Sequence, residues 1–209
     1  VLTWTKAEAN QTVAELRKQV AQQFSRCVDE VKFVADGRPL LDDELCSELI
    51  SGRSEVLEVL VVTQQIPQLD PDMPMINQLD TMKAMIQSSS PEYQLDAATQ
   101  YRKLLSIERD PPIAKILESG VAPRLLELVQ KMDSPKLQFE ALWAVCNIVS
   151  GDQYQTAAMV ELDVVPIVTK ILGESEEPDV VEQGVWALGN VAGDCAVHRD
   201  LCLNAGALP

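Results

Sequence analysis

The sequence predicts two parts: a small α+β domain over residues 1–66 and an all-α solenoid of helical repeats over residues 79–209. The first prediction rests on strand-like and helix-like stretches that alternate in the first third of the chain. The second rests on two series of prolines, each of which recurs every 43 or 44 residues and marks a helix start. The prolines are Pro91, Pro135 and Pro178 in one series, and Pro123, Pro166 and Pro209 in the other.

In the N-terminal part, one helix is expected between short strands. Residues 1–5 alternate as a strand does, and Asn10 or Thr12 can cap the helix that follows. Residues 31–34 and 57–62 predict two further strands. The apolar face of the helix is expected to consist of Val13, Leu16, Val20 and Phe24.

Two short motifs in this part resemble the ubiquitin-like, or β-grasp, fold. They are Phe33-Val-Ala-Asp-Gly-Arg-Pro-Leu-Leu-Asp-Asp, whose Asp-Gly pair signals a turn, and Ser54-Glu-Val-Leu-Glu-Val-Leu-Val. That fold has a hairpin before its helix, but only one strand is visible here, so we expect the other to precede residue 1 or to have been lost. No Gly-Gly ends the closing strand, which excludes a conjugated tag. The resemblance therefore implies a docking domain or a folded extension.

Residues 67–78 are predicted to link the two parts, because prolines at 67, 71 and 74 prevent a continuous helix. From residue 79 onward the pattern is helical, and its period of 43–44 residues is typical of armadillo and HEAT repeats. About three repeats are present. A further helix would begin at Pro209, so we expect the native protein to be longer and its last repeat here to be incomplete.

Two of the repeats carry a tryptophan on an otherwise polar helix face. Trp143 is followed four residues later by Asn147, and Trp186 by Asn190, so each pair lies on one face of its helix. Asp194 continues the second face by another four residues. The opposite, apolar stripes are expected to be buried; they comprise Leu142, Val145 and Val149, and Val185, Leu188 and Ala192. One helix tryptophan is usually a packed residue, but two in register favour a binding surface.

Charge and composition exclude several classes of function. The net charge is −15, and residues 132–209 alone carry 3 basic and 12 acidic side chains, which would repel nucleic acid and suit a basic partner. No apolar run approaches the length of a membrane span. The five cysteines are scattered without a CxxC, and His198 is the only histidine, which argues against most zinc sites and against base catalysis by histidine. We therefore expect neither an enzyme nor a bound cofactor or metal.

Two segments resemble importin-α closely. They are Ser134-Pro-Lys-Leu-Gln-Phe-Glu-Ala-Leu-Trp-Ala-Val-Cys-Asn-Ile-Val-Ser-Gly and Glu182-Gln-Gly-Val-Trp-Ala-Leu-Gly-Asn-Val-Ala-Gly-Asp. Tyr101-Arg-Lys-Leu-Leu-Ser-Ile-Glu-Arg-Asp-Pro-Pro-Ile is similar to the family's first repeat, so the resemblance covers about residues 79–209. It implies a receptor for nuclear localisation signals in nuclear protein import, present in both cytoplasm and nucleus. In that family an extended basic peptide lies along the third helices of the repeats.

The resemblance also implies which residues contact such a peptide. The tryptophans would form walls between which lysine or arginine stems insert, and the asparagines would hydrogen-bond the peptide backbone. The carbonyl group of Gly151, with Thr156 and Asp194, would hold the ammonium of a pivotal lysine. The implied peptide-binding residues are Trp143, Asn147, Ser150, Gly151, Thr156, Gln183, Trp186, Asn190 and Asp194. General chemistry favours these roles, since indole faces attract cations by ~0.5–2 kcal/mol per contact and an amide both donates and accepts hydrogen bonds.

Two departures from the family affect the expected partners. The first repeat has Thr99 and Lys103 where later copies have tryptophan and asparagine, so the series of paired residues begins at Trp143. The basic N-terminal segment through which importin-α binds importin-β does not precede the repeats, and this puts importin-β docking in question.

Two alternative functions stay open. One is a ubiquitin-pathway adaptor, in which residues 1–66 dock to a ubiquitin or proteasome partner; a pull-down with those residues tests it. The other is an armadillo scaffold without import activity, which predicts that replacing Trp143 and Trp186 by alanine leaves partner binding unchanged.

Overall fold

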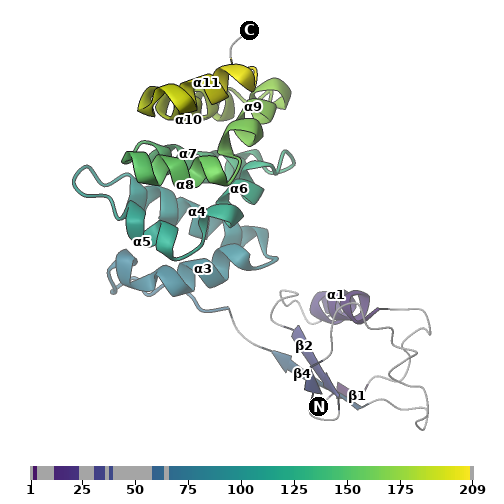
Figure 1. Cartoon of the computed structure of the whole chain (residues 1–209). Coiled ribbons are helices and arrows are strands. Elements are labelled where there is room, and N and C mark those ends of the chain that lie inside the picture. Colours follow the sequence, from purple (N-terminus) through teal and green to yellow (C-terminus); the bar gives the residue numbers. More distant parts are fainter. Residues whose placement is uncertain are drawn as a thin grey trace. The chain divides into compact units, whose positions relative to one another are not determined.

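The computed structural model describes residues 2–3, 12–23, 31–35, 38–39, 58–63 and 66–207. Contacts divide the chain into two units, whose elements are labelled in Figure 1. The first unit comprises Val1–Pro67 with Ser88–Ser90, and the second comprises Gln68–Gln87 with Pro91–Pro209. All the helices from residue 79 onward therefore belong to the second unit.

In the described residues of the first unit, four strands form a sheet. Its strands are β1 (Leu2–Thr3), β2 (Val31–Ala35), β3 (Arg38–Pro39) and β4 (Glu58–Thr63), in the order β1-β4-β2-β3. All neighbouring strands are antiparallel, with Leu2 opposite Val59 and Phe33 opposite Val61. β2 and β4 coincide with two of the expected strands. The ubiquitin-like fold itself stays a prediction, because most residues of the two motifs lie outside the described part of the chain.

Helix α1 (Val13–Gln23) begins with a capping box. The backbone N–H of Glu15 donates to the hydroxyl of Thr12 at 3.3 Å, and the Thr12 N–H donates to the Glu15 carboxylate at 2.9 Å. Of the two candidate caps, Thr12 is therefore the one used. Val13, Leu16 and Val20 are buried, as the helical pattern predicts, whereas Phe24 lies outside the described residues.

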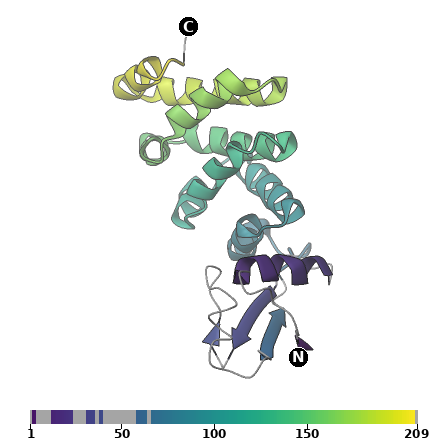
Figure 2. The ribbon, with the colours of Figure 1, turned by 90° about the vertical axis from the view of Figure 1, so that its right-hand side faces the viewer.

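In its described part, the second unit consists of helices that follow one another as successive layers, shown from two sides in Figures 1 and 2. A short 3₁₀ helix, η2 (Met75–Gln78), precedes them. The α-helices are α3 (Leu79–Gln87), α4 (Pro91–Leu105), α5 (Ile113–Glu118), α6 (Ala122–Val129), α7 (Pro135–Val149), α8 (Gln153–Glu161), α9 (Val164–Glu174), α10 (Pro178–Asp194) and α11 (Ala196–Asn204).

These helices form repeats of three in which the third helix is the longest. α5, α6 and α7 make one repeat, and α8, α9 and α10 make the next. Helix α7 packs against α4 on one side and α10 on the other, so the third helices of successive repeats are neighbours. Pro135 and Pro178 are the first helical residues of α7 and α10, where a missing N–H costs no hydrogen bond. The helical-repeat solenoid predicted from the proline periods is confirmed.

The segment predicted as a linker is ordered around one buried glutamine. The side-chain NH₂ of Gln78 donates to the carbonyl groups of Asp70 and Met73 at 2.9 Å each, and its side-chain oxygen accepts from the Asp70 N–H. The amide thus satisfies backbone groups that have no helical partner. From residue 68 onward, this segment belongs to the helical unit.

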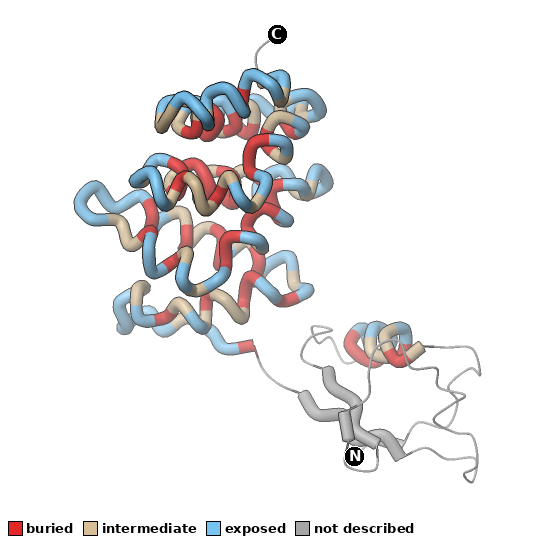
Figure 3. Tube along the Cα trace, viewed as in Figure 1, coloured by how far each residue is buried: buried red, intermediate tan, exposed pale blue. Residues whose placement is uncertain are grey.

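The core of the second unit runs through the layers from α3 to α10, as the red positions in Figure 3 show. In α7 the predicted apolar stripe of Leu142, Val145 and Val149 is buried. Helix α11, by contrast, buries only Cys202. Within the described ranges, no helix is long and apolar enough to cross a membrane.

Candidate functional site

The paired tryptophan and asparagine residues lie on two neighbouring third helices. Trp143 and Asn147 come from α7, and Trp186 and Asn190 come from α10. The two helices pack side by side, so the pairs repeat from one helix to the next. The rings differ in exposure: Trp186 is 60% exposed, whereas Trp143 is half-buried.

The Trp143 ring is covered by a cation from the preceding third helix. The guanidinium carbon of Arg102, on α4, lies 4.8 Å from the ring centroid. The Arg102 Nε also donates to the carboxylate of Glu140 at 2.7 Å, and the Phe139 ring meets Trp143 edge-on at 5.5 Å. Sequence reasoning missed Arg102, because its contact bridges residues 41 positions apart. One indole of the site is thus already engaged with a basic side chain.

Both asparagines use their NH₂ groups to contact the preceding third helix. Asn147 donates to the hydroxyl of Ser106 at 3.0 Å, and Asn190 donates to the carbonyl of Cys146 at 3.3 Å. Among the described residues, neither side-chain oxygen accepts a hydrogen bond. Each amide therefore keeps an acceptor for a ligand's backbone N–H, while its own position is held by the neighbouring helix.

The remaining residues expected to contact a peptide differ in how far they are exposed. Ser150 is exposed and donates to the Asn147 carbonyl at 2.8 Å, and Gln183 is half-buried one turn before Trp186. Thr156, in contrast, is only 1% exposed, and its hydroxyl donates to the carbonyl of Val149 at 3.2 Å. Its side chain is therefore engaged inside the protein, unlike the surface position expected for a lysine contact.

Gly151 and Asp194 lie at the C-terminal ends of α7 and α10. The half-buried Gly151 follows α7, and an added Cβ would meet Gln155 and the Ile113 side chain, so the space beside it is limited. Asp194 is the last residue of α10, and its carboxylate lies 2.7 Å from the Nδ1 atom of His198. The two side chains are each 12% exposed. Asp194 thus has a partner within the chain that sequence reasoning did not identify.

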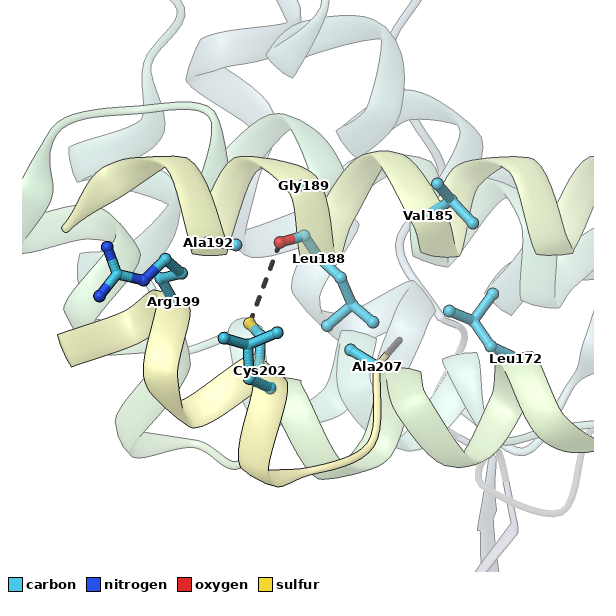
Figure 4. A pocket seen from close by; sticks show the side chains of 9 residues that line it. Leu172, Val185, Leu188, Gly189, Ala192, Arg199, Cys202 and Ala207 are labelled. Atoms are coloured by element: carbon cyan, nitrogen blue, oxygen red, sulfur yellow. Dashed lines mark hydrogen bonds between the residues drawn. The ribbon is translucent and has the colours of Figure 1, made fainter. Parts of the chain in front are cut away.

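The apolar stripe of α10 departs from the expectation at two positions, of which Ala192 is the smaller departure because it is half-buried. Val185 was expected to be buried, but it is 58% exposed. Together with Leu188 and Ala192, it borders an apolar cavity of about 380 Å³ between α9, α10 and α11, shown in Figure 4. The expectation was wrong for Val185 because no helix of the described chain packs over this part of α10. The cavity is lined by Leu172, Val185, Leu188, Gly189, Ala192, Arg199, Cys202, Leu203 and Ala207.

The cysteines of the helical unit are free thiols. Cys146 and Cys202 are buried, and Cys195 is partly exposed. Burial raises the pKa of the Cys146 thiol to about 11 and also raises the pKa of Cys202. Neither buried thiol is suited to act as a nucleophile at neutral pH, because the thiolate is the reactive form.

Comparisons with known proteins agree with this architecture. The family model "Armadillo/beta-catenin-like repeat" matches residues 109–150, which hold α5, α6 and α7. Importin subunit alpha-1b of Oryza sativa subsp. japonica is 52% identical over 130 residues, 62% of this chain and 24% of the relative. Importin subunit alpha-2 of Arabidopsis thaliana is 42% identical over 185 residues, 83% of this chain and 34% of the relative. The match to the Arabidopsis importin subunit alpha-5 is 38% over 201 residues, 92% of this chain and 38% of the relative.

Solved structures share the fold of the helical unit. A designed armadillo repeat protein, solved in complex with the peptide (KR)4, superposes with a TM-score of 0.58 at 26% identity, over 63% of this chain and 54% of the other. An engineered protein superposes with a TM-score of 0.57 at 27% identity, over 62% of this chain and 51% of the other.

The chain spans between 24% and 38% of the length of these importin subunits. The expectation that it is not an enzyme agrees with its similarity to importin subunits and to armadillo repeats. Repeat length, helix order and sequence identity agree with one another: the chain is an armadillo-repeat homologue of importin-α.

Proposed function

We propose that this chain binds basic nuclear localisation signals as extended peptides along α7 and α10, for nuclear protein import. The observation that carries the proposal is the repeated pairing of Trp143 with Asn147 and Trp186 with Asn190 on adjacent third helices. A peptide strand that crosses these helices meets the same pair of groups at each step. The basic (KR)4 peptide in the complex of the designed armadillo protein is an example of such a ligand for this fold.

Each group has a defined task in the proposed complex. The exposed Trp186 indole covers the methylene stem of a lysine or arginine and attracts its charge. The free side-chain oxygens of the two asparagines accept peptide N–H groups whatever the side chains are, which gives affinity without sequence preference. Asp194 adds a charge-assisted hydrogen bond to one ammonium group, roughly twice as strong as a neutral one.

The remaining residues are proposed to add further contacts or to support the site. The Gly151 carbonyl would accept from the same ammonium as Asp194, and Ser150 and Gln183 would contact the peptide beside the tryptophans. Thr156 is kept in the proposed site only as a buried support, since its hydroxyl donates to the Val149 carbonyl.

The net charge of −9 over residues 132–209 favours the same class of ligand. It attracts a lysine-rich peptide from a distance and makes the association dependent on salt. It also opposes nucleic acid as the partner. Homology to importin-α implies a nucleocytoplasmic location, and we propose that the protein shuttles between cytoplasm and nucleus with such cargo.

The alternative function assigns the main role to residues 1–66 as a ubiquitin-like docking domain in a ubiquitin or proteasome pathway. The observation that favours it is the antiparallel pairing of β4 with β2 and of β2 with β3, after one helix. The antiparallel pairing of β1 with β4 departs from the β-grasp fold, whose first and last strands are parallel neighbours. Recovery of proteasomal proteins on these residues would favour the adaptor.

The deciding experiment is the binding of a fluorescently labelled lysine-rich signal peptide to the whole chain at two salt concentrations. We expect binding that weakens with salt and is lost in Asp194→Lys. The matched control is Asp200→Lys, which makes the same change of charge at an exposed aspartate beside Arg199, outside the proposed site. Equal binding of a scrambled acidic peptide, or equal loss in both variants, would refute the proposal.

A further inference from the structure

A cluster of three potential metal ligands lies where α10 passes into α11. Asp194 ends α10, Cys195 is the residue between the helices, and His198 lies in the first turn of α11. The carboxylate, the sulfur and a ring nitrogen all lie within 4.8 Å of one another, and all three residues are partly buried. Within the part of the chain that the structure describes, this is the one such group of histidine, cysteine and acidic side chains.

The three donor atoms match the ligands that zinc prefers. Zinc binds thiolate, imidazole and carboxylate, and three protein ligands leave one position for water. In a tetrahedral site with bonds of about 2.0–2.3 Å, the ligand atoms are about 3.3–3.8 Å apart. The Asp194 and His198 atoms are 2.7 Å apart and no pair exceeds 4.8 Å, so shifts within about an ångström reach that geometry.

The charges of the cluster also fit a divalent cation. A thiolate from Cys195 and the carboxylate of Asp194 neutralise two positive charges, and a neutral imidazole adds no charge. A single histidine argued against zinc at the level of the sequence. One histidine is enough here, because a thiol and a carboxylate lie beside the same imidazole.

We propose that Asp194, Cys195 and His198 form a site for a zinc-like divalent cation, and that the cation competes with a peptide lysine for Asp194. The competition rests on the proposed function, whereas the metal site does not. A bound cation occupies the carboxylate and places positive charge where the peptide carries its own. Loss of one charge-assisted hydrogen bond corresponds to about a ten- to hundredfold loss of peptide affinity.

The metal site is tested by titrating Co²⁺ into the whole chain under reducing conditions and recording its absorption spectrum. We expect a thiolate-to-cobalt charge-transfer band that Zn²⁺ displaces. The band should disappear in Cys195→Ser, and the affinity for Co²⁺ should fall at least about tenfold in His198→Gln. Cys202→Ser is the matched control, since this buried cysteine lies on α11 outside the cluster and should leave the band unchanged. An unchanged band in Cys195→Ser would place the cation elsewhere and overturn the proposal.

The competition is tested separately by measuring lysine-rich peptide binding with and without saturating Zn²⁺. Zinc should weaken binding to the unsubstituted chain and leave binding to Cys195→Ser unchanged. Peptide affinity that zinc does not alter would refute the competition. If the peptide fails to bind even without metal, the proposed function fails, and the cobalt spectrum still decides whether the metal site exists.

Discussion

Replacing each tryptophan of the site by alanine should affect a different property of the protein. Trp143 is half-buried, with Arg102 over its ring at 4.8 Å and Phe139 against it at 5.5 Å. Trp186 is 60% exposed and has no aromatic or cationic partner among the described residues. We therefore expect Trp143→Ala to destabilise the fold and Trp186→Ala to weaken peptide binding while the fold is retained.

The magnitudes follow from these contacts. An edge-to-face aromatic pair contributes about 0.5–1.5 kcal/mol and an exposed cation–π contact about 0.5–1 kcal/mol. With the lost burial of a half-covered indole, Trp143→Ala should lower the free energy of unfolding by about 2–4 kcal/mol. Trp186→Ala should lower it by about 1 kcal/mol or less. Loss of the Trp186 wall should cost about 1–2 kcal/mol of binding, or about a 5- to 30-fold rise in Kd.

Two assays separate the effects. Urea unfolding followed by helical circular dichroism gives the change in the free energy of unfolding. Fluorescence anisotropy of a labelled lysine-rich peptide gives Kd at a temperature where each variant is folded. A Trp186→Ala variant that is destabilised as much as Trp143→Ala, or that binds the peptide with an unchanged Kd, would contradict these expectations.

Three further predictions concern stability. Glu140→Gln removes the charge that faces a guanidinium on α4, and should lower the free energy of unfolding by about 1–3 kcal/mol in urea titrations; an unchanged midpoint would contradict this. Gly184→Ala would place a Cβ 2.8 Å from Leu172 Cδ2 and should lower the free energy of unfolding by about 1–3 kcal/mol. Gly189→Ala, in the same helix with no atom within 4 Å of the added Cβ, should raise it by about 0.5–1 kcal/mol. Equal melting temperatures of the two variants would contradict this prediction. Because burial raises the pKa of Cys146, the stability that its protonated thiol contributes is complete below its ordinary pKa of 9.0 and is lost as pH rises toward about 11. If Cys146→Ala loses the same free energy of unfolding at alkaline pH, this thiol is not the cause.

Much of the fold follows from local features that the chain repeats. A proline at the first helical position needs no tertiary partner, because the N–H it lacks would not be bonded within the helix. The positions of Pro135 and Pro178 therefore predicted where α7 and α10 begin. The same 43-residue spacing placed Trp143 and Trp186 at equivalent points of successive repeats. Stacked repeats then bring equivalent points together, so the row of tryptophan and asparagine side chains was predictable.

The sequence by itself determined the repeat architecture, the importin-α resemblance and the shared helix face of each tryptophan and asparagine pair, because these depend on periodicity and local chemistry. Only the tertiary structure decided how far each candidate residue is exposed and which partner it has. Arg102 covers Trp143, Thr156 is turned inward, and Val185 is left exposed. The first of these outcomes depends on a side chain from a neighbouring repeat, and the others on which groups pack against each helix. Periodicity determines the direction in which a residue points, but not the group it meets there.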